Sequence, residues 1–166
     1  MKKVMMLLCL MAAFAINAMA DNTPWKIIDM EDVSRTGSNC EYDDETCTAE
    51  FKNQWNRWFD LPGVRGDISE HTNMVLTILK SNCMLKVVVR YHGEDGKVKE
   101  VTAATLYGSM GKTIDSKKTV KVDLTSKGKI SSDILKNIVG IRIAMAKAVD
   151  GSEAPWTTQF GPTTIY

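Results

Sequence analysis

The stretch NMVLTILKSNCMLKVVVRYHGEDGK, residues 73–97, decides the fold class. It contains two short runs rich in β-branched and other apolar residues, 73–79 and 84–91, and in the second run apolar residues alternate with the others. A period of two is typical of a strand with one buried face. The Asp-Gly pair at 95–96 supplies the positive-φ positions that a tight turn needs, so a hairpin loop is predicted over 92–97.

The same pattern continues on both sides of this hairpin, and helical periodicity is scarce. Seven or eight short strands with turn signals between them predict an antiparallel β-sandwich, an all-β fold with at most one short helical turn. The further strands are expected over 25–30, 51–59 (with a bulge or twist), 98–106, 118–124, 138–146 and 156–166. The helical turn is expected over 131–136, and a long polar loop over 31–48.

The first twenty residues predict export. Two lysines precede an almost unbroken apolar run over 4–16, and Ala-Met-Ala at 18–20 is a small-x-small cleavage site. The run is short for a bilayer span and no second apolar segment follows it. We therefore expect a cleaved signal peptide over 1–20, a single domain over 21–166 and no transmembrane segment. The mature protein is expected to be located in the periplasm, at the cell surface or in the medium.

The charge balance excludes one class of partner. The chain has 21 Lys and Arg residues against 20 Asp and Glu residues, a formal charge of +1, and losing the two leader lysines leaves 19 against 20, a charge of −1. A nucleic-acid-binding domain normally carries a basic surplus. We expect no nucleic-acid partner.

Three cysteines remain once the leader is removed. Cys40 and Cys47 flank a six-residue polar loop. In an oxidising compartment this spacing predicts a small disulfide ring, worth roughly 2–3 kcal/mol. Cys83 lies in an apolar strand and is expected to be a buried free thiol. No CxxC or HxxxH spacing is present, so these cysteines do not predict a zinc site.

Aromatic residues beside polar ones are the candidate ligand residues, because a sugar ring presents an apolar face to a Trp or Tyr ring while its hydroxyls bind polar neighbours. Trp58 leads, since strand alternation places it on the face opposite Trp55, and Trp156 follows a polar loop over 150–153. The alternative is that Trp55 and Trp58 are both core or loop-buttressing residues and that Trp156 is a packing residue. The other expected ligand residues are Arg57, Asn56, Tyr91, His92 and Tyr107.

Hydrolytic catalysis has little support in the sequence. His71 and His92 lie in turn contexts, and Asp67 and Ser69 are too close to His71 in the chain to form a triad with it. No two carboxylates stand out as a glycosidase pair. We expect a binding module rather than an enzyme.

Three segments carry a resemblance to a known family: NQWNRW at 53–58 with DLP and GDISEHT downstream to 72, NCMLKVVVRY at 82–91, and DILKNIVGIRI at 133–143. They resemble the galactose-binding-like jelly-roll domains, the superfamily that includes many carbohydrate-binding modules. The likeness is to small secreted sandwiches of polysaccharide-degrading gut bacteria.

The resemblance implies an exported, non-catalytic domain that binds a glycan or polysaccharide or assists in carbohydrate handling. A structural or protein-interaction sandwich of a cell-surface assembly, with a surface protein as partner, is the alternative, and a small secreted glycan hydrolase is the third. Related jelly rolls often hold a structural calcium between the first and last strands, which makes Asp29 and Glu31 the candidate ligands here. The alternative for these carboxylates is a solvated acidic surface.

Export makes a direct prediction. The exported protein should begin at Asp21, because Ala18 and Ala20 occupy the small-residue positions of a signal-peptidase site. Mass spectrometry of the protein recovered outside the cytoplasm measures this. A mass that includes Met1 would contradict it.

Overall fold

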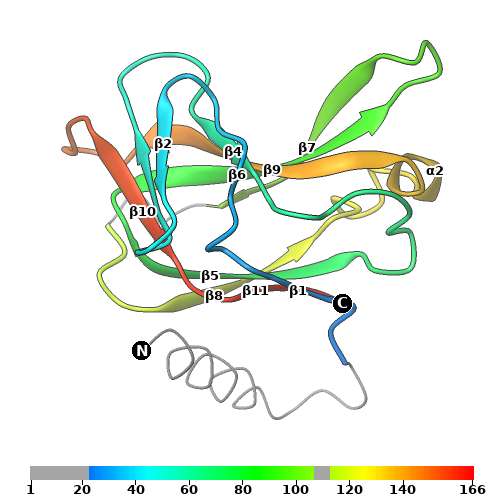
Figure 1. Cartoon of the computed structure of the whole chain (residues 1–166), viewed down its shortest axis with the longest axis horizontal. Helices are drawn as coiled ribbons and strands as arrows, with labels where there is room; N and C mark the ends of the chain where they lie inside the picture. The colour runs from blue at the N-terminus through cyan, green and yellow to red at the C-terminus, as the bar shows by residue number, and fades with distance from the viewer. Residues whose placement is uncertain (1–22, 107–112) are drawn as a thin grey trace.

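The computed structural model describes residues 23–106 and 113–166 (Figure 1). The expected signal peptide and Tyr107 lie outside the described residues. The described elements, in chain order, are β1 (Lys26–Ile28), β2 (Cys40–Asp43), β3 (Thr48–Phe51), β4 (Trp58–Asp60), β5 (Asn73–Ser81), β6 (Cys83–His92), β7 (Val98–Leu106), β8 (Lys118–Asp123), α2 (Ser132–Leu135), β9 (Ile138–Ala148), β10 (Trp156–Phe160) and β11 (Thr163–Ile165).

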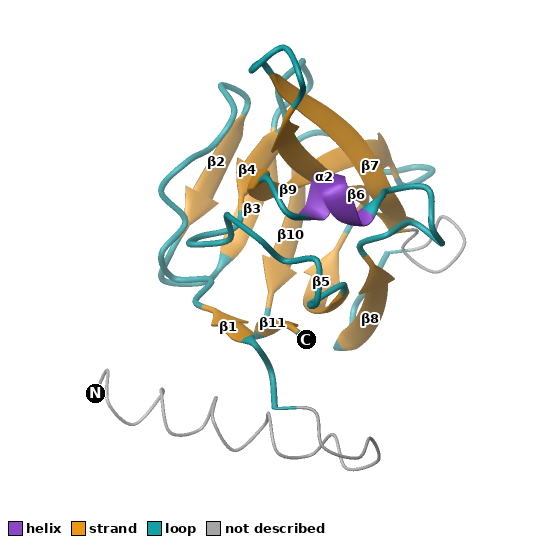
Figure 2. Cartoon of the chain, turned by 90° about the vertical axis from the view of Figure 1, so that its right-hand side faces the viewer, coloured by secondary structure: helices purple, strands orange, loops and turns teal. Residues whose placement is uncertain are grey.

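These strands form two antiparallel sheets that lie as layers (Figures 1 and 2). The seven-stranded sheet has the order β1-β11-β5-β10-β3-β2, with β8 on the other edge of β5. The four-stranded sheet has the order β4-β9-β6-β7. The predicted all-β sandwich is confirmed, and the architecture is compatible with a jelly roll.

Alternation along β6 separates the core from the surface. Leu85, Val87 and Val89 are buried in the core between the sheets, while Lys86 and Arg90 fall on the opposite face of the same strand. We call that opposite side of the four-stranded sheet the outer face.

Aromatic rings join the two layers across the core. Phe59 of β4 and Phe160 of β10 belong to different sheets, and their ring centroids are 5.2 Å apart in an edge-to-face arrangement. Tyr42 of β2 lies 5.0 Å from Phe59. Such pairs add to the free energy that area burial alone supplies.

Several local predictions are confirmed. The turn over 92–97 joins β6 to β7, and Gly96 has the positive φ, 71°, that the Asp-Gly signal implies. The helical turn is α2, where the Ser131 side chain caps the helix by accepting a hydrogen bond from the Ile134 amide.

Two predictions about residues 31–59 are wrong. The long loop expected over 31–48 contains β2, which pairs with β3 in a hairpin. The strand expected over 51–59 is interrupted, because β3 ends at Phe51 and β4 begins only at Trp58. Asn56 adopts a φ of 60°, a left-handed conformation that the short polar side chain of asparagine tolerates and that a regular strand does not contain.

The predicted disulfide between Cys40 and Cys47 is also wrong, since the two cysteines are not at disulfide distance. In the hairpin ladder Cys40 pairs with Phe51, four residues beyond Cys47. Four residues of strand span about 13 Å, whereas a disulfide needs its two Cα atoms within about 7 Å. The ladder therefore holds the two thiols at opposite ends of the hairpin.

Burial makes two of the thiols unreactive. Cys83 is a buried free thiol, as predicted, and its Sγ lies 3.3 Å from Oγ1 of Thr158. Burial raises the pKa of Cys83 above its ordinary value. Burial likewise raises the pKa of Cys40 from 9.0 to about 12. Both groups are therefore neutral thiols in the folded protein at physiological pH.

We predict that Cys40 in the folded protein resists iodoacetamide at pH 8, because only the thiolate reacts and the buried group stays protonated. After unfolding in urea without reductant, Cys40 should be alkylated quickly. Peptide mapping by mass spectrometry measures both states. A peptide cross-linked between Cys40 and Cys47 in the unreduced digest would contradict the structure.

Candidate functional site

The outer face carries a charged cluster to which each strand of the four-stranded sheet contributes one residue. Asp60 of β4 pairs in register with Arg142 of β9, and Arg90 of β6 pairs with Glu100 of β7. Because alternate residues of each strand point outward and the strands are in register, these side chains meet on one surface. We call these four residues the ion-pair cluster.

Asp60 is the centre of the ion-pair cluster. Its carboxylate accepts a hydrogen bond from Arg90 Nη1 at 2.8 Å and another from Arg142 Nε at 2.8 Å. Glu100 accepts hydrogen bonds from Arg142 Nη1 at 2.6 Å and from Arg90 Nε at 3.3 Å. The side chains of Asp60, Arg90 and Arg142 are only 12%, 9% and 10% exposed. Each buried charge therefore has an opposite charge against it.

Trp58 lies on the outer face beside this cluster and is half-buried. The guanidinium carbon of Arg142 lies 3.3 Å from the centroid of the Trp58 ring, and that of Arg35 lies 6.0 Å from it. One side of the ring is therefore covered by a cation. Trp58 faces outward as the alternation of β4 predicts, but it is not an open platform on the side that Arg142 covers.

The segment before β2 packs tightly against β4 at Gly37. The Gly37 amide donates to the Trp58 carbonyl at 2.7 Å. A Cβ atom at residue 37 would clash with the Asn56 carbonyl oxygen and would lie 2.8 Å from Nε1 of Trp58. Only glycine fits there, and the close approach brings residues 35–39 alongside residues 55–60.

Trp55 is the most exposed large hydrophobic residue in the described part of the chain, at 89%. It lies in the loop 52–57, between β3 and β4, and the Asn39 side chain donates to its carbonyl oxygen at 2.6 Å. The sequence prediction placed Trp55 within a strand, on the face opposite Trp58. The available signal was the polar run around it, KNQWNR at 52–57, which argues for a loop.

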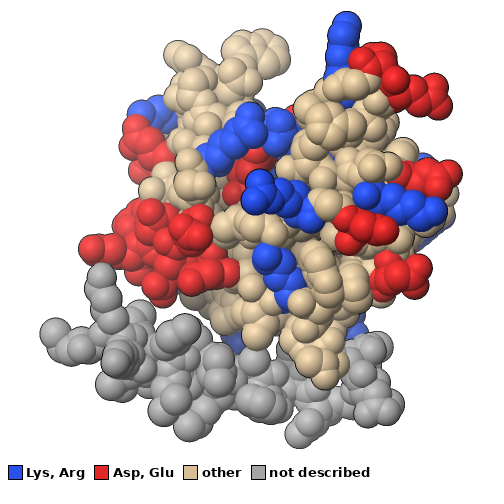
Figure 3. Space-filling model, turned by 45° about the vertical axis from the view of Figure 1, so that its right-hand side comes forward, with Lys and Arg blue, Asp and Glu red and all other residues tan. Residues whose placement is uncertain are grey.

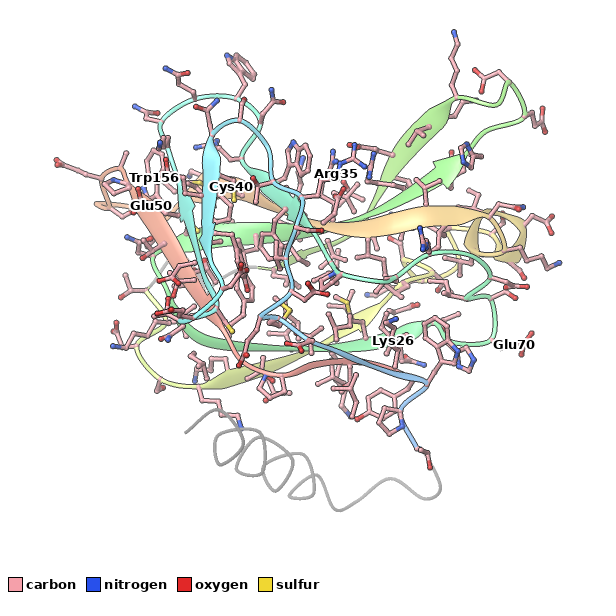
Figure 4. All side chains as sticks on the ribbon, viewed as in Figure 1. Lys26, Arg35, Cys40, Glu50, Glu70 and Trp156 are labelled. Atoms are coloured by element: carbon pink, nitrogen blue, oxygen red, sulfur yellow. The ribbon has the colours of Figure 1, made fainter. Side chains whose placement is uncertain are left out.

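The face between this loop and the β6–β7 hairpin is hollowed. Figure 1 places the loop before β4 on one side of the molecule and the hairpin on the other. In the space-filling view, two lobes rise on either side of a hollow that contains lysine or arginine side chains (Figure 3). Arg35 lies in this region between the two (Figure 4).

The other expected ligand residues are dispersed. Trp156 is 7% exposed and its Nε1 donates to Ser152 Oγ at 3.1 Å. The expectation of a solvent-facing ring is therefore wrong, because β10 turns Trp156 into the hydrophobic core. The guanidinium of Arg57 lies 5.4 Å from the Trp156 ring.

Asn56 is in the Trp55 loop, where its side-chain amide lies 3.5 Å from Ser38 Oγ. Tyr91 is half-buried in β6. His92 is exposed at the end of β6 and, with Arg65 and Lys136, lines a separate shallow pocket of about 430 Å³.

The residues proposed as calcium ligands do not converge with others. The Asp29 carboxylate accepts the Glu31 amide at 2.9 Å, which is a local turn. Over residues 23–106 and 113–166, no group of three or more His, Cys, Asp or Glu side chains is arranged to hold a metal ion. The same ranges contain no helix that is long and apolar enough to cross a membrane.

No family model matches the sequence, and no curated protein matches it in a sequence search. The argument about function therefore depends on the outer face and the Trp55 loop.

We predict that Asp60→Ala destabilises the protein by about 3–5 kcal/mol, because it leaves two nearly buried arginines without their main partner. Urea unfolding measures the change. Asp150→Ala is the matched control: Asp150 is 86% exposed and pairs only with Lys147 at 3.5 Å, so its loss should cost less than about 1 kcal/mol. Equal costs for the two variants would show that the ion-pair cluster does not constrain the sheet.

Proposed function

We propose that this chain is an exported, non-catalytic glycan-binding β-sandwich of the carbohydrate-binding-module type, related to the galactose-binding-like jelly rolls. The observation that supports the proposal is the exposure of Trp55. A tryptophan ring held in water at 89% exposure has an apolar face that a sugar ring can cover.

The neighbours of Trp55 suit the same ligand. The loop and the adjacent segment present side-chain amides and a hydroxyl, which bind sugar hydroxyls. These residues are Ser38, Asn39, Asn53, Gln54 and Asn56.

The loop is also fixed before any ligand arrives. The Lys52 amide donates to the Asn39 carbonyl at 3.1 Å, and the Asn39 amide donates to the Asn56 carbonyl at 3.3 Å. A preorganised platform loses less conformational entropy on binding than a mobile one. Ligand residues on a loop that a rigid sheet supports are the usual arrangement in binding proteins.

Protein interaction is the second candidate function, since an exposed tryptophan is also a common hot spot of protein interfaces. The edge strand β7 with its exposed Val98, 46% accessible, adds a surface on which another strand could pair. A glycan-binding assay separates the two functions.

We predict that Trp55→Ala abolishes retardation of the protein in gels that contain its polysaccharide, while the melting temperature stays within a degree or two (about 0.5 kcal/mol). The ring makes few contacts in the fold, so its loss removes ligand contact rather than packing. Affinity electrophoresis against a panel of plant, algal and animal polysaccharides measures binding, and thermal unfolding measures stability.

Two tryptophan variants serve as controls for this experiment. Trp25→Ala removes another exposed ring, one that is stacked on His71 at 4.9 Å, and should leave retardation intact. Trp156→Ala removes a buried ring and should cost roughly 3–5 kcal/mol. Retardation that survives Trp55→Ala, or a protein that no polysaccharide retards, would reject the proposal.

A further inference from the structure

The outer face has more positive than negative charge. Register places Lys86 of β6 opposite Ala144, which in turn pairs with Trp58, so Lys86 lies on the same surface as the ion-pair cluster. Arg35 approaches Trp58 from the segment before β2. Four cations therefore share this surface with two carboxylates: Arg35, Lys86, Arg90 and Arg142 against Asp60 and Glu100.

Two of these cations are not needed to balance the carboxylates. Arg90 and Arg142 already contact both Asp60 and Glu100 and form the nearly buried floor of the surface. Arg35 reaches Asp60 only through Nε, at 3.6 Å, and its side chain is 63% exposed. Lys86 makes no ion pair or side-chain hydrogen bond with another described residue, although it is half-buried. Both therefore carry charge that an external anion can neutralise.

Arg35 and the Trp55 platform belong to one continuous edge beside β4, and Lys86 lies on the adjoining outer face, two strands in from β4. The Asp60 amide donates to the Arg35 carbonyl at 3.0 Å, and at the other end the Asn39 side chain donates to the Trp55 carbonyl. Residues 35 and 36 run alongside β4, and the chain then turns at 37–40, where the Cys40 amide donates to the Gly37 carbonyl at 3.0 Å. A ligand that covers Trp55 and also reaches Arg35 therefore follows this segment along β4.

The positive charge of Arg35 and Lys86 determines which class of glycan this surface binds. A guanidinium fork and an ammonium group bind carboxylate and sulfate groups through charge-assisted hydrogen bonds. A neutral sugar would leave Lys86 without a counter-charge and Arg35 with only the shared Asp60 carboxylate at 3.6 Å, whereas an acidic sugar supplies a counter-charge to each cation. A group bound in the hollow between the two lobes is in contact with less solvent than a group on a flat surface (Figure 3). Its attraction to the cations is therefore screened less.

We infer that the ligand is an acidic polysaccharide, whose carboxylate or sulfate groups bind Arg35 and Lys86 while Trp55 stacks on a sugar ring. This inference rests on the proposed glycan-binding function and specifies its substrate class.

The test uses affinity electrophoresis of the exported protein at low and high salt. Polygalacturonate supplies carboxylates, chondroitin sulfate supplies sulfates, dextran is the neutral polysaccharide, and polyglutamate is a polyanion without sugar rings. The variants are Arg35→Gln and Lys86→Gln. Their charge-matched controls are Lys117→Gln and Lys129→Gln, which remove exposed cations before and after β8, a strand of the other sheet.

Retardation by polygalacturonate or chondroitin sulfate is expected. It should weaken as salt rises. Each of Arg35→Gln and Lys86→Gln should reduce the affinity about tenfold or more, with the controls unchanged and melting temperatures preserved. Trp55→Ala should also abolish retardation by the acidic polysaccharide. Binding of polyglutamate, which has no sugar rings, would not depend on Trp55.

The results that would overturn the acidic ligand differ from those that would overturn the proposed function. Retardation by dextran that is lost in Trp55→Ala but unaffected by Arg35→Gln and Lys86→Gln overturns the acidic ligand and leaves the glycan function standing. Polyglutamate binding as strong as polysaccharide binding overturns it too, because charge alone would then be recognised. Failure of every polysaccharide to retard the protein overturns the proposed function itself.

Discussion

The contact of Asp60 with Arg90 and Arg142 is the interaction on which the outer face depends. It joins the three-residue edge strand β4 to β9 and β6, and Glu100 extends it to β7. Burying charges costs free energy unless partners are in place, so this contact contributes less to net stability than to specificity. A shift of register by one residue would turn Asp60 into the apolar core and leave the arginines unpaired.

Strand alternation within β4 links this contact to the core and to the site. Phe59 points inward to Phe160, while its neighbours Trp58 and Asp60 point outward. With β4 fixed on both faces, the segment around Gly37 can pack against it, and that segment in turn supports the loop of Trp55. The exposed ring is therefore held by interactions that begin in the core.

The near-neutral net charge conceals a separation of charge. Arg35 and Lys86 lie on the outer face, whereas Glu41, Asp43 and Glu50 line a shallow pocket on the β2–β3 hairpin. Acidic side chains gather at one side of the molecule (Figure 3). A sum over the chain excludes a strongly basic protein, but it does not exclude a local site for an anion.

The sequence by itself determined the features that depend on local periodicity and turn chemistry. The strands around 73–106, the Asp-Gly turn, the cap at Ser131 and the burial of Cys83 follow from neighbours within a few residues. The all-β sandwich follows from their number and spacing. Local patterns of this kind do not predict which strands lie next to each other in the two sheets.

Only the tertiary structure decided what depends on pairing between distant segments. Asp60 meets Arg142 from 82 residues away, and no local pattern specifies that contact. The β2–β3 ladder separates Cys40 from Cys47, the packing of β10 against the core buries Trp156, and the break at Asn56 exposes Trp55. Each outcome is set by sheet register, a long-range property that emerges only when the whole core is packed.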